Sequence, residues 1–386
     1  MPKIYLDYQT ATPLHPEVRA AMAPYLAERF GSPAALNLYG MQARDALKEA
    51  REKLAAFVNA PAPDDLIFTS DGTEAMNLAV KGVAWANRSR GNHIVISAIE
   101  HPGVDRSAEF LESHGYQITR LPVDETGRID PTTVAAALRD DTLLVVTHIA
   151  NHDLGTLQPV QEIGELVATR GIPFFVDAEA AAGWLPVNVR ELRASLLSFS
   201  PSRFYGPKGV GVLYRSGRVP LMSLIHGGEQ EHRHRAGNEN IPAIVGAGVA
   251  AELATAAMVD RGDRLSALQQ QLWQGIAAAI PDVRLNGPPP DGGRRRALHA
   301  LNVSFAGVEG EGVALAADLK GLVIASGPAC RGKAVKVSPT LRAIGVPDDL
   351  ARANVLLSLG DETTPAEIDA ATDILAKVVE RLRSLN

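Results

Sequence analysis

Several polar side chains follow short apolar runs in the middle of the chain. Ser200, Ser202 and Arg203 lie between the apolar run 196–199 and a Gly- and Pro-containing turn at 205–209. Hydroxyl groups and a guanidinium are suited to binding an anion such as a phosphate. Asp177 ends another very apolar run. Burial of its carboxylate requires either a cation or several hydrogen-bond donors, which neighbouring backbone could also supply.

Two further residues begin predicted helices. Thr73 lies in the turn Gly72-Thr73-Glu74, where a hydroxyl and free backbone N–H groups can bind a phosphate. The alternative is an ordinary helix N-cap. His101 follows the apolar run 93–97, and its imidazole could stack on an aromatic ring or make a structural hydrogen bond.

Cys330 is the only cysteine in the chain. A single cysteine can form neither a disulfide nor a metal site made of cysteines alone within one chain. Arg331, Lys333 and Lys336 follow it, and such cations favour the reactive thiolate. The alternative is a structural cysteine.

The elements that must position these residues alternate between strand and helix. Strands are predicted at the apolar runs 66–69, 93–97, 117–121, 142–148, 174–177 and 196–200, with helices between them. This alternation is typical of parallel βαβ units, which bind ligands at the carboxyl ends of their strands. The candidate residues lie at those ends.

The length of 386 residues favours two domains. A long Ala-rich helix is expected from about 246 to 280, with a charged interruption near 260–264. We expect it to join a large domain of residues 15–255 to a small domain of residues 1–14 with 256–386. The run 287–296 is expected to be an exposed loop.

Composition excludes some function classes. The net charge of −6 and the lack of a polybasic tract disfavour nucleic acid as a partner. We find no run of about eighteen apolar residues, and the N-terminus continues directly into a strand-like segment. We therefore expect a cytoplasmic protein without a membrane span.

The run 196–209, together with 175–178, resembles the pyridoxal-phosphate (PLP) segment of cysteine desulfurases, in the class V aminotransferase group of fold-type I PLP enzymes. That family has Ser-Phe-Ser, then Gly-His-Lys, then Tyr-Gly-Pro-Lys-Gly, whereas this chain has Pro201-Ser202-Arg203. A guanidinium stays protonated and cannot form an imine. The resemblance implies an α/β fold, with a large doubly wound, mostly parallel sheet domain and a smaller α+β C-terminal domain.

The resemblance also implies roles for other residues. It covers about residues 4 to 384 and includes the segments 5–13, 31–40, 226–240 and 325–345. Cys330 corresponds to the cysteine that becomes a persulfide, and His101 to the imidazole that stacks on the cofactor ring. The implied cofactor-binding residues are Gly72, Thr73, Asn151, Asp177, Ser200, Ser202 and Asn238, the last from a segment that reaches the partner subunit's site.

Other positions depart from the family pattern. Leu356 replaces an arginine that holds the substrate carboxylate bidentately, which leucine cannot do. Ala180 replaces a glutamine near the cofactor, and Asn37 replaces a histidine. Lys208 belongs to a separate turn that active members also carry. His232 and His234 could suggest a metal site, although an exposed basic loop accounts for them more simply.

These observations leave three hypotheses. In the first, the protein acts in sulfur transfer or iron–sulfur cluster assembly without PLP-imine chemistry, and Cys330 carries a persulfide or ligates a cluster with a partner. In the second, PLP binds without a covalent link and supports desulfurase, lyase or aminotransferase-like activity. In the third, the protein is an inactive partner of an active desulfurase. The resemblance implies a homodimer, and an iron–sulfur scaffold or sulfur-acceptor protein is a further possible partner, whereas the third hypothesis implies a hetero-oligomer with the active desulfurase.

Overall fold

The computed structural model describes residues 3–327 and 337–385. Cys330 and the cations that follow it lie outside the described residues.

A seven-stranded sheet forms the centre of the large domain. Its strand order is β2-β8-β7-β6-β5-β3-β4, and only β8 runs against the others. The strands are β2 (Leu66–Thr69), β3 (His93–Ser97), β4 (Gln117–Leu121), β5 (Thr142–His148), β6 (Phe174–Asp177), β7 (Leu196–Phe199) and β8 (Gly211–Arg215). The predicted strands and the mostly parallel sheet are confirmed.

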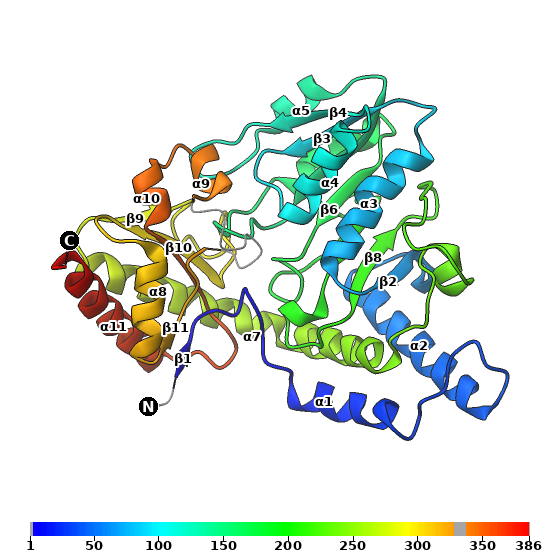
Figure 1. The fold of residues 1–386 in the computed structure, drawn as a ribbon, viewed down its shortest axis with the longest axis horizontal. Helices are drawn as coiled ribbons and strands as arrows, with labels where there is room; N and C mark the ends of the chain where they lie inside the picture. Colours follow the sequence, from blue (N-terminus) through cyan, green and yellow to red (C-terminus); the bar gives the residue numbers. More distant parts are fainter. Residues whose placement is uncertain (1–2, 328–336, 386) are drawn as a thin grey trace.

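Helices cover both faces of this sheet (Figure 1). One face packs against α3 (Gly72–Ala86) and α4 (Pro102–Glu112). The other packs against α2 (Leu38–Phe57), α5 (Pro131–Ala137), α6 (Val160–Thr169) and the first half of α7 (Ile241–Ala279). Because both faces are buried, most of the strands are continuous apolar runs rather than alternating ones.

A second hydrophobic core belongs to the small domain. It lies around the antiparallel sheet β12-β10-β9, formed by β9 (Val283–Asn286), β10 (Ala300–Phe305) and β12 (Asn354–Ser358). The helices α8 (Gly310–Leu319) and α11 (Pro365–Arg383) pack on it. We retain 15–255 and 1–14 with 256–386 as the proposed division.

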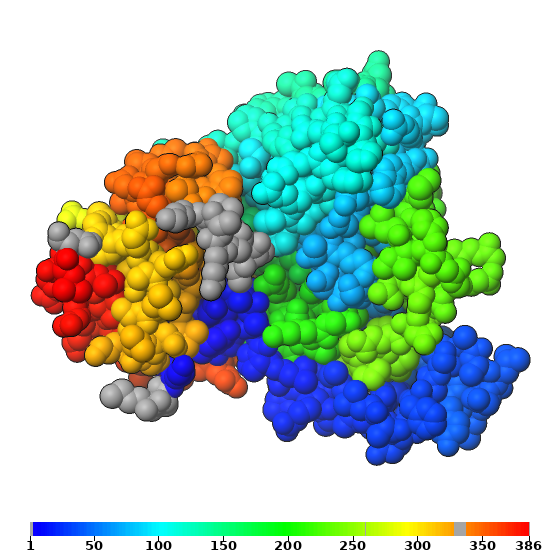
Figure 2. All heavy atoms as spheres, viewed as in Figure 1, coloured from blue at the N-terminus to red at the C-terminus, as the bar shows by residue number. Residues whose placement is uncertain are grey.

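The N-terminal segment connects the two cores. Strand β1 (Ile4–Tyr5) pairs in parallel with β11 (Leu322–Val323). In Figure 2 the dark blue N-terminal segment lies between the yellow small domain and the green part of the large domain. This position brings residues 8–10 to the junction of the domains.

The prediction for α7 was partly wrong. The helix begins at Ile241 and continues through 260–264 without the expected interruption. The reason is that Arg261 is buried in a bidentate pair with Asp361, at 2.7 and 2.5 Å. The window Ile241–Met258 is also apolar enough to span a membrane by composition, contrary to the sequence expectation, but α7 packs against α1 (Pro16–Met22) and α2 as a core helix.

The loop 287–296 is not wholly exposed as expected, because Arg296 is fully buried. Its guanidinium donates to the carbonyls of Pro288 and Leu154 at 2.6 Å and of Asn286 at 2.5 Å. Burial lowers the pKa of Arg296 to about 9. Backbone carbonyls here replace the water that a charged side chain would otherwise require.

Candidate functional site

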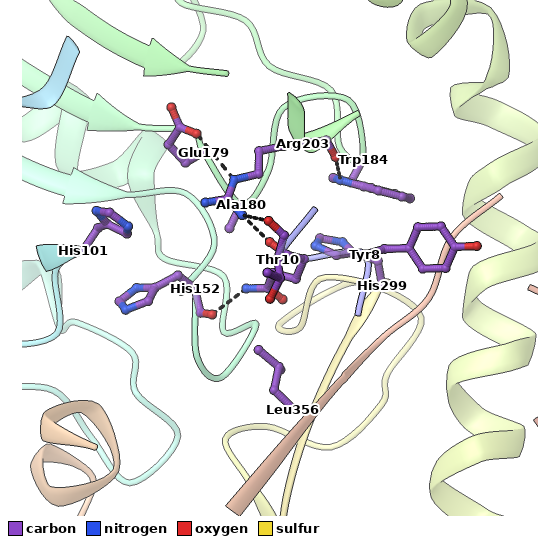
Figure 3. Close-up of a pocket in the computed structure, with 11 residues that line it drawn as sticks. Tyr8, Thr10, His101, His152, Glu179, Ala180, Trp184, Arg203, His299 and Leu356 are labelled. Carbon is purple, nitrogen blue, oxygen red and sulfur yellow. Dashed lines mark hydrogen bonds and ion pairs between the residues drawn. The ribbon is translucent and has the colours of Figure 1, made fainter. Parts of the chain in front are cut away.

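A pocket lies between the large sheet and the small domain (Figure 3). Its large-domain residues come from loops that follow β3, β5, β6 and β7, as expected for a sheet whose ligands bind at the carboxyl ends of its strands. The lining residues are Tyr8, Gln9, Thr10, His101, His152, Glu179, Ala180, Trp184, Arg203, His299 and Leu356.

Arg203 is at the centre of the pocket and is held by several partners. It ends a short 3-10 turn, Pro201–Arg203, directly after β7. Its guanidinium donates to the carbonyls of Gln9 and Thr10, and its Nε lies 3.7 Å from Glu179 Oε2. The Trp184 indole N–H donates to the Arg203 carbonyl at 2.9 Å. Both the side chain and the backbone of Arg203 are therefore committed to contacts within the protein.

Glu179 is a buried residue of the site that the sequence analysis did not identify. Its Oε1 accepts a hydrogen bond from the Ser200 hydroxyl at 3.0 Å. The same hydroxyl accepts from the backbone N–H of Gly72 at 2.8 Å. The available signal was a carboxylate directly after an apolar strand and two residues after Asp177.

Asp177 is buried at the end of β6. Its Oδ1 accepts from the backbone N–H of Glu179 at 2.8 Å, which corresponds to the backbone-bonded alternative considered from the sequence. Burial, followed by the nearby carboxylates of Glu179 and Glu100, raises the pKa of Asp177 well above its ordinary value. The environment of Asp177 therefore opposes a negative charge.

His101 is the N-cap of α4. Its Nδ1 accepts from the Gly103 backbone N–H at 3.0 Å, which places the ring proton of the neutral form on Nε2. Burial, with smaller contributions from Arg203 and His148, lowers the pKa of His101 to about 4. The ring packs edge to face against His152, with centroids 5.2 Å apart.

The remaining predicted residues are spread over three environments. Thr73, Ser200 and Ser202 line an adjoining cavity together with Lys208. Asn151 is fully buried, accepts from the backbone N–H groups of Asp153 and Leu154, and donates to the Ile99 carbonyl. Asn151 is absent from the lining of the pocket described above, whereas its neighbour His152 contributes to it.

Asn238 is exposed and lines a separate cavity beside Arg235. Arg235 Nε donates to Glu74 Oε1 at 3.0 Å. Within residues 3–327 and 337–385, no group of three His, Cys, Asp or Glu side chains is placed to hold a metal ion. His232 is largely exposed.

The small-domain side of the pocket is mainly apolar and aromatic. Leu356 lies on β12 and is buried. Trp184 and His299 stack with ring centroids 4.8 Å apart, and burial lowers the pKa of His299 to about 3. Tyr8, His152, Trp184 and His299 were all missed, since nothing in their spacing distinguishes them from core residues.

We tested whether these residues fit PLP, the cofactor that the sequence resemblance implies. Arg203 cannot form the imine. A Cβ atom placed on Gly72 would lie 1.7 Å from Glu179 Oε1, so a carboxylate already fills the space beside the start of α3. Position 203 and the space beside Gly72 therefore do not fit PLP bound as an imine with its phosphate against Gly72.

Known proteins resemble this chain over nearly its whole length. The model of the family "Aminotransferase class-V" matches residues 4–370. Cysteine desulfurase IscS of Dictyoglomus turgidum is 42% identical over 384 residues, which cover all of this chain and 96% of the relative. The corresponding protein of Methanosarcina thermophila is 39% identical, over 99% of this chain and 93% of the relative.

Two solved structures are also similar. A NifS-like protein has a TM-score of 0.91 and 28% identity, covering 98% of this chain and all of that one. SspA in complex with cysteine has a TM-score of 0.79 and 32% identity, covering 92% and 98%. The chain therefore belongs to the class V aminotransferase family, and the two relatives named above are cysteine desulfurases of similar length.

Proposed function

We propose that this protein transfers sulfur, in the manner of a cysteine desulfurase relative, but does not carry out ordinary PLP-dependent desulfuration. The family as a whole uses PLP. The observation that carries the proposal is Arg203, which stands at the position of the family's lysine and whose guanidinium is bound to Glu179 and to the carbonyls of Gln9 and Thr10. A guanidinium stays protonated and has no free primary amine, so Arg203 cannot form an imine with an aldehyde.

Leu356 supports the same proposal independently. It lines the same pocket as Arg203 and is buried on β12. An amino-acid substrate needs its carboxylate held by a cation at a defined angle. Leucine offers only an apolar surface at this position.

Cys330, which lies outside the described residues, is the proposed sulfur carrier. Its thiolate would attack the terminal sulfur of a donor persulfide R–S–SH. The new S–S bond forms as the donor S–S bond breaks, which yields Cys330–S–SH and R–S⁻. No oxidant is consumed, because the transferred sulfur keeps its oxidation state. Cys330 could alternatively ligate an iron–sulfur cluster that is being assembled on a partner.

The proposed setting is a cytoplasmic homodimer that works with an iron–sulfur scaffold or another sulfur acceptor. Exposed apolar residues in the segment 26–41 support the association of two copies, among them Leu26, Phe30 and Leu36. Phe30 stacks on Tyr39 with centroids 4.9 Å apart. Light scattering of the purified protein would measure the oligomeric state, and a monomer would contradict the homodimer.

Two measurements test the function. Sulfide release from free L-cysteine should be at background with added PLP. After incubation with glutathione persulfide, alkylation and mass spectrometry should find one additional sulfur at Cys330, and Cys330→Ser should abolish it. Rapid turnover of free cysteine, or failure of Cys330 to accept sulfur from any persulfide donor, would contradict the proposal.

A further inference from the structure

The start of α3 and the Ser200 hydroxyl together form a cradle suited to an anion. Helix α3 has 15 residues and begins at Gly72 after its N-cap Asp71, whose Oδ1 accepts from the Glu74 backbone N–H at 2.9 Å. The positive end of its dipole faces the cavity that Gly72, Ser200 and Arg203 line. Gly72 has no side chain, and its N–H points to the Ser200 hydroxyl at 2.8 Å. We call Gly72, Ser200 and the facing part of Arg203 the anion cradle.

The anion in this cradle belongs to the chain itself. Glu179 is 6% exposed, and its Oε1 accepts from Ser200 at 3.0 Å. The space that a Cβ atom on Gly72 would take is filled by the same carboxylate, with Oε1 at 1.7 Å and the carboxyl carbon at 2.3 Å from that point. The Glu179 carboxylate therefore lies directly against Gly72, the first residue of α3.

The remaining contacts hold Glu179 in place. Its backbone N–H donates to Asp177 Oδ1 at 2.8 Å, and its Oε2 faces Arg203 Nε at 3.7 Å. Figure 3 shows the Glu179 carboxylate turned toward Arg203, whose far end reaches the N-terminal segment at Thr10. Burial raises the pKa of Glu179, and the charge of Arg203 opposes that shift, so Arg203 is the cation that favours the charged carboxylate.

We propose that Glu179 is a built-in anion whose carboxylate takes the place of the phosphate group of a phosphorylated ligand in the anion cradle, so that the protein excludes phosphorylated pyridine compounds such as PLP. This inference deepens the proposed function, on which it rests for the class of ligand that is excluded. A phosphate monoester carries a charge of about −1.5 to −2 near neutral pH. A phosphate bound against Gly72 and Ser200 would meet the Glu179 carboxylate, which contacts both residues, and the two like charges would repel each other.

Direct binding tests this inference without relying on activity. The probe is pyridoxamine 5′-phosphate, which has the phosphate but no aldehyde and so cannot form imines with surface lysines. Unphosphorylated pyridoxamine is the matched ligand. Isothermal titration calorimetry would compare the unmodified protein with Glu179→Ala and Glu179→Gln. Glu165→Ala, which removes one exposed carboxylate from α6, is the control for the change in net charge.

We expect the unmodified protein and Glu165→Ala to bind pyridoxamine 5′-phosphate weakly or not at all. Glu179→Ala should gain at least tenfold in affinity for it and should show no comparable gain for pyridoxamine. Glu179→Gln keeps the shape of the side chain and should gain less than Glu179→Ala. Thermal unfolding would verify that each variant is folded, and Glu179→Gln provides the test if Glu179→Ala is not.

Three results would overturn the inference: equal binding of the phosphorylated probe by the unmodified protein and Glu179→Ala, equal gains for both probes, or an equal gain in Glu165→Ala. None of these results bears on sulfur acceptance at Cys330. Conversely, turnover of free cysteine by the unmodified protein would end the proposed function without measuring what occupies the cradle.

Discussion

The two sides of the pocket differ in how their charged groups are used. On the large-domain wall, formed by His101, Glu179 and Arg203, charged groups are present but are bound to one another and to the backbone. On the small-domain wall, formed by Tyr8, His299 and Leu356, the charge is missing. The charged groups of one wall are paired within the protein, whereas the other wall lacks a charge. Under the proposed function, a change in one wall alone should therefore not give turnover of free cysteine.

The largest expected effect comes from placing a charge on the small-domain wall. Leu356→Arg would put a guanidinium into a buried position on β12 and should lower the free energy of unfolding by about 3 to 5 kcal/mol, the usual cost of an uncompensated buried charge. Urea denaturation measures this. Leu356→Met, which nearly conserves volume, should cost less than about 1.5 kcal/mol. Equal stability of Leu356→Arg and the unmodified protein would show that this wall can already accommodate a cation.

A smaller effect is expected on the large-domain wall. Arg203→Ala removes the cation facing the buried Glu179 carboxylate and should cost about 1 to 3 kcal/mol, less than a fully buried pair because the Arg203 side chain is 29% exposed and the separation is 3.7 Å. Adding Glu179→Gln to Arg203→Ala should recover part of the loss. Strictly additive effects in this double-mutant cycle would contradict the coupling of the two residues.

The pH dependence of stability tests the charge of Asp177. Because its pKa is raised in the folded protein, the unfolded chain loses this proton first, and stability falls as pH rises from about 4 through the raised pKa. Glu179, Glu100 and Arg203 face this carboxyl. Asp177→Asn should therefore show a smaller loss of stability between pH 5 and pH 8 than the unmodified protein. Parallel stability curves for the two proteins would refute the assignment.

The smallest expected effect concerns His101, whose pKa is lowered by burial first and then by Arg203 and His148. Its pKa of about 4 means that the folded protein resists protonation while the unfolded chain accepts it below about pH 6.5. Stability is thus lost as pH falls, by about 1 kcal/mol between pH 7 and pH 5.5 for this residue. His101→Gln should remove that part of the slope. An NMR titration showing His101 charged at pH 6 would contradict the neutral ring.

Residue patterns predicted the fold better than the site. Apolar runs identified six of the seven strands of the large sheet, because burial on both faces leaves a simple signal, whereas β8 (Gly211–Arg215) was not predicted. The sequence also predicted departures from the family pattern at Arg203 and Leu356, and the structure places both side chains in one pocket.

What the sequence could not supply were contacts between distant segments. A charged interruption was expected near 260–264, but Arg261 in that range pairs with Asp361, a hundred residues away. Glu179 can be identified as a site residue only from its contacts with Gly72 and Ser200. His299 can be identified only from its stacking on Trp184. Such pairings depend on tertiary packing, which local patterns do not encode.

The central claim is that the position of the cofactor lysine no longer supports an imine. The most direct test is to incubate the unmodified protein with PLP, reduce it with borohydride, and map any adduct by peptide mass spectrometry. We predict no stoichiometric reduced adduct and no absorption band that survives desalting. A single stoichiometric adduct in the site, for which Lys208 would be the first suspect, would contradict the account.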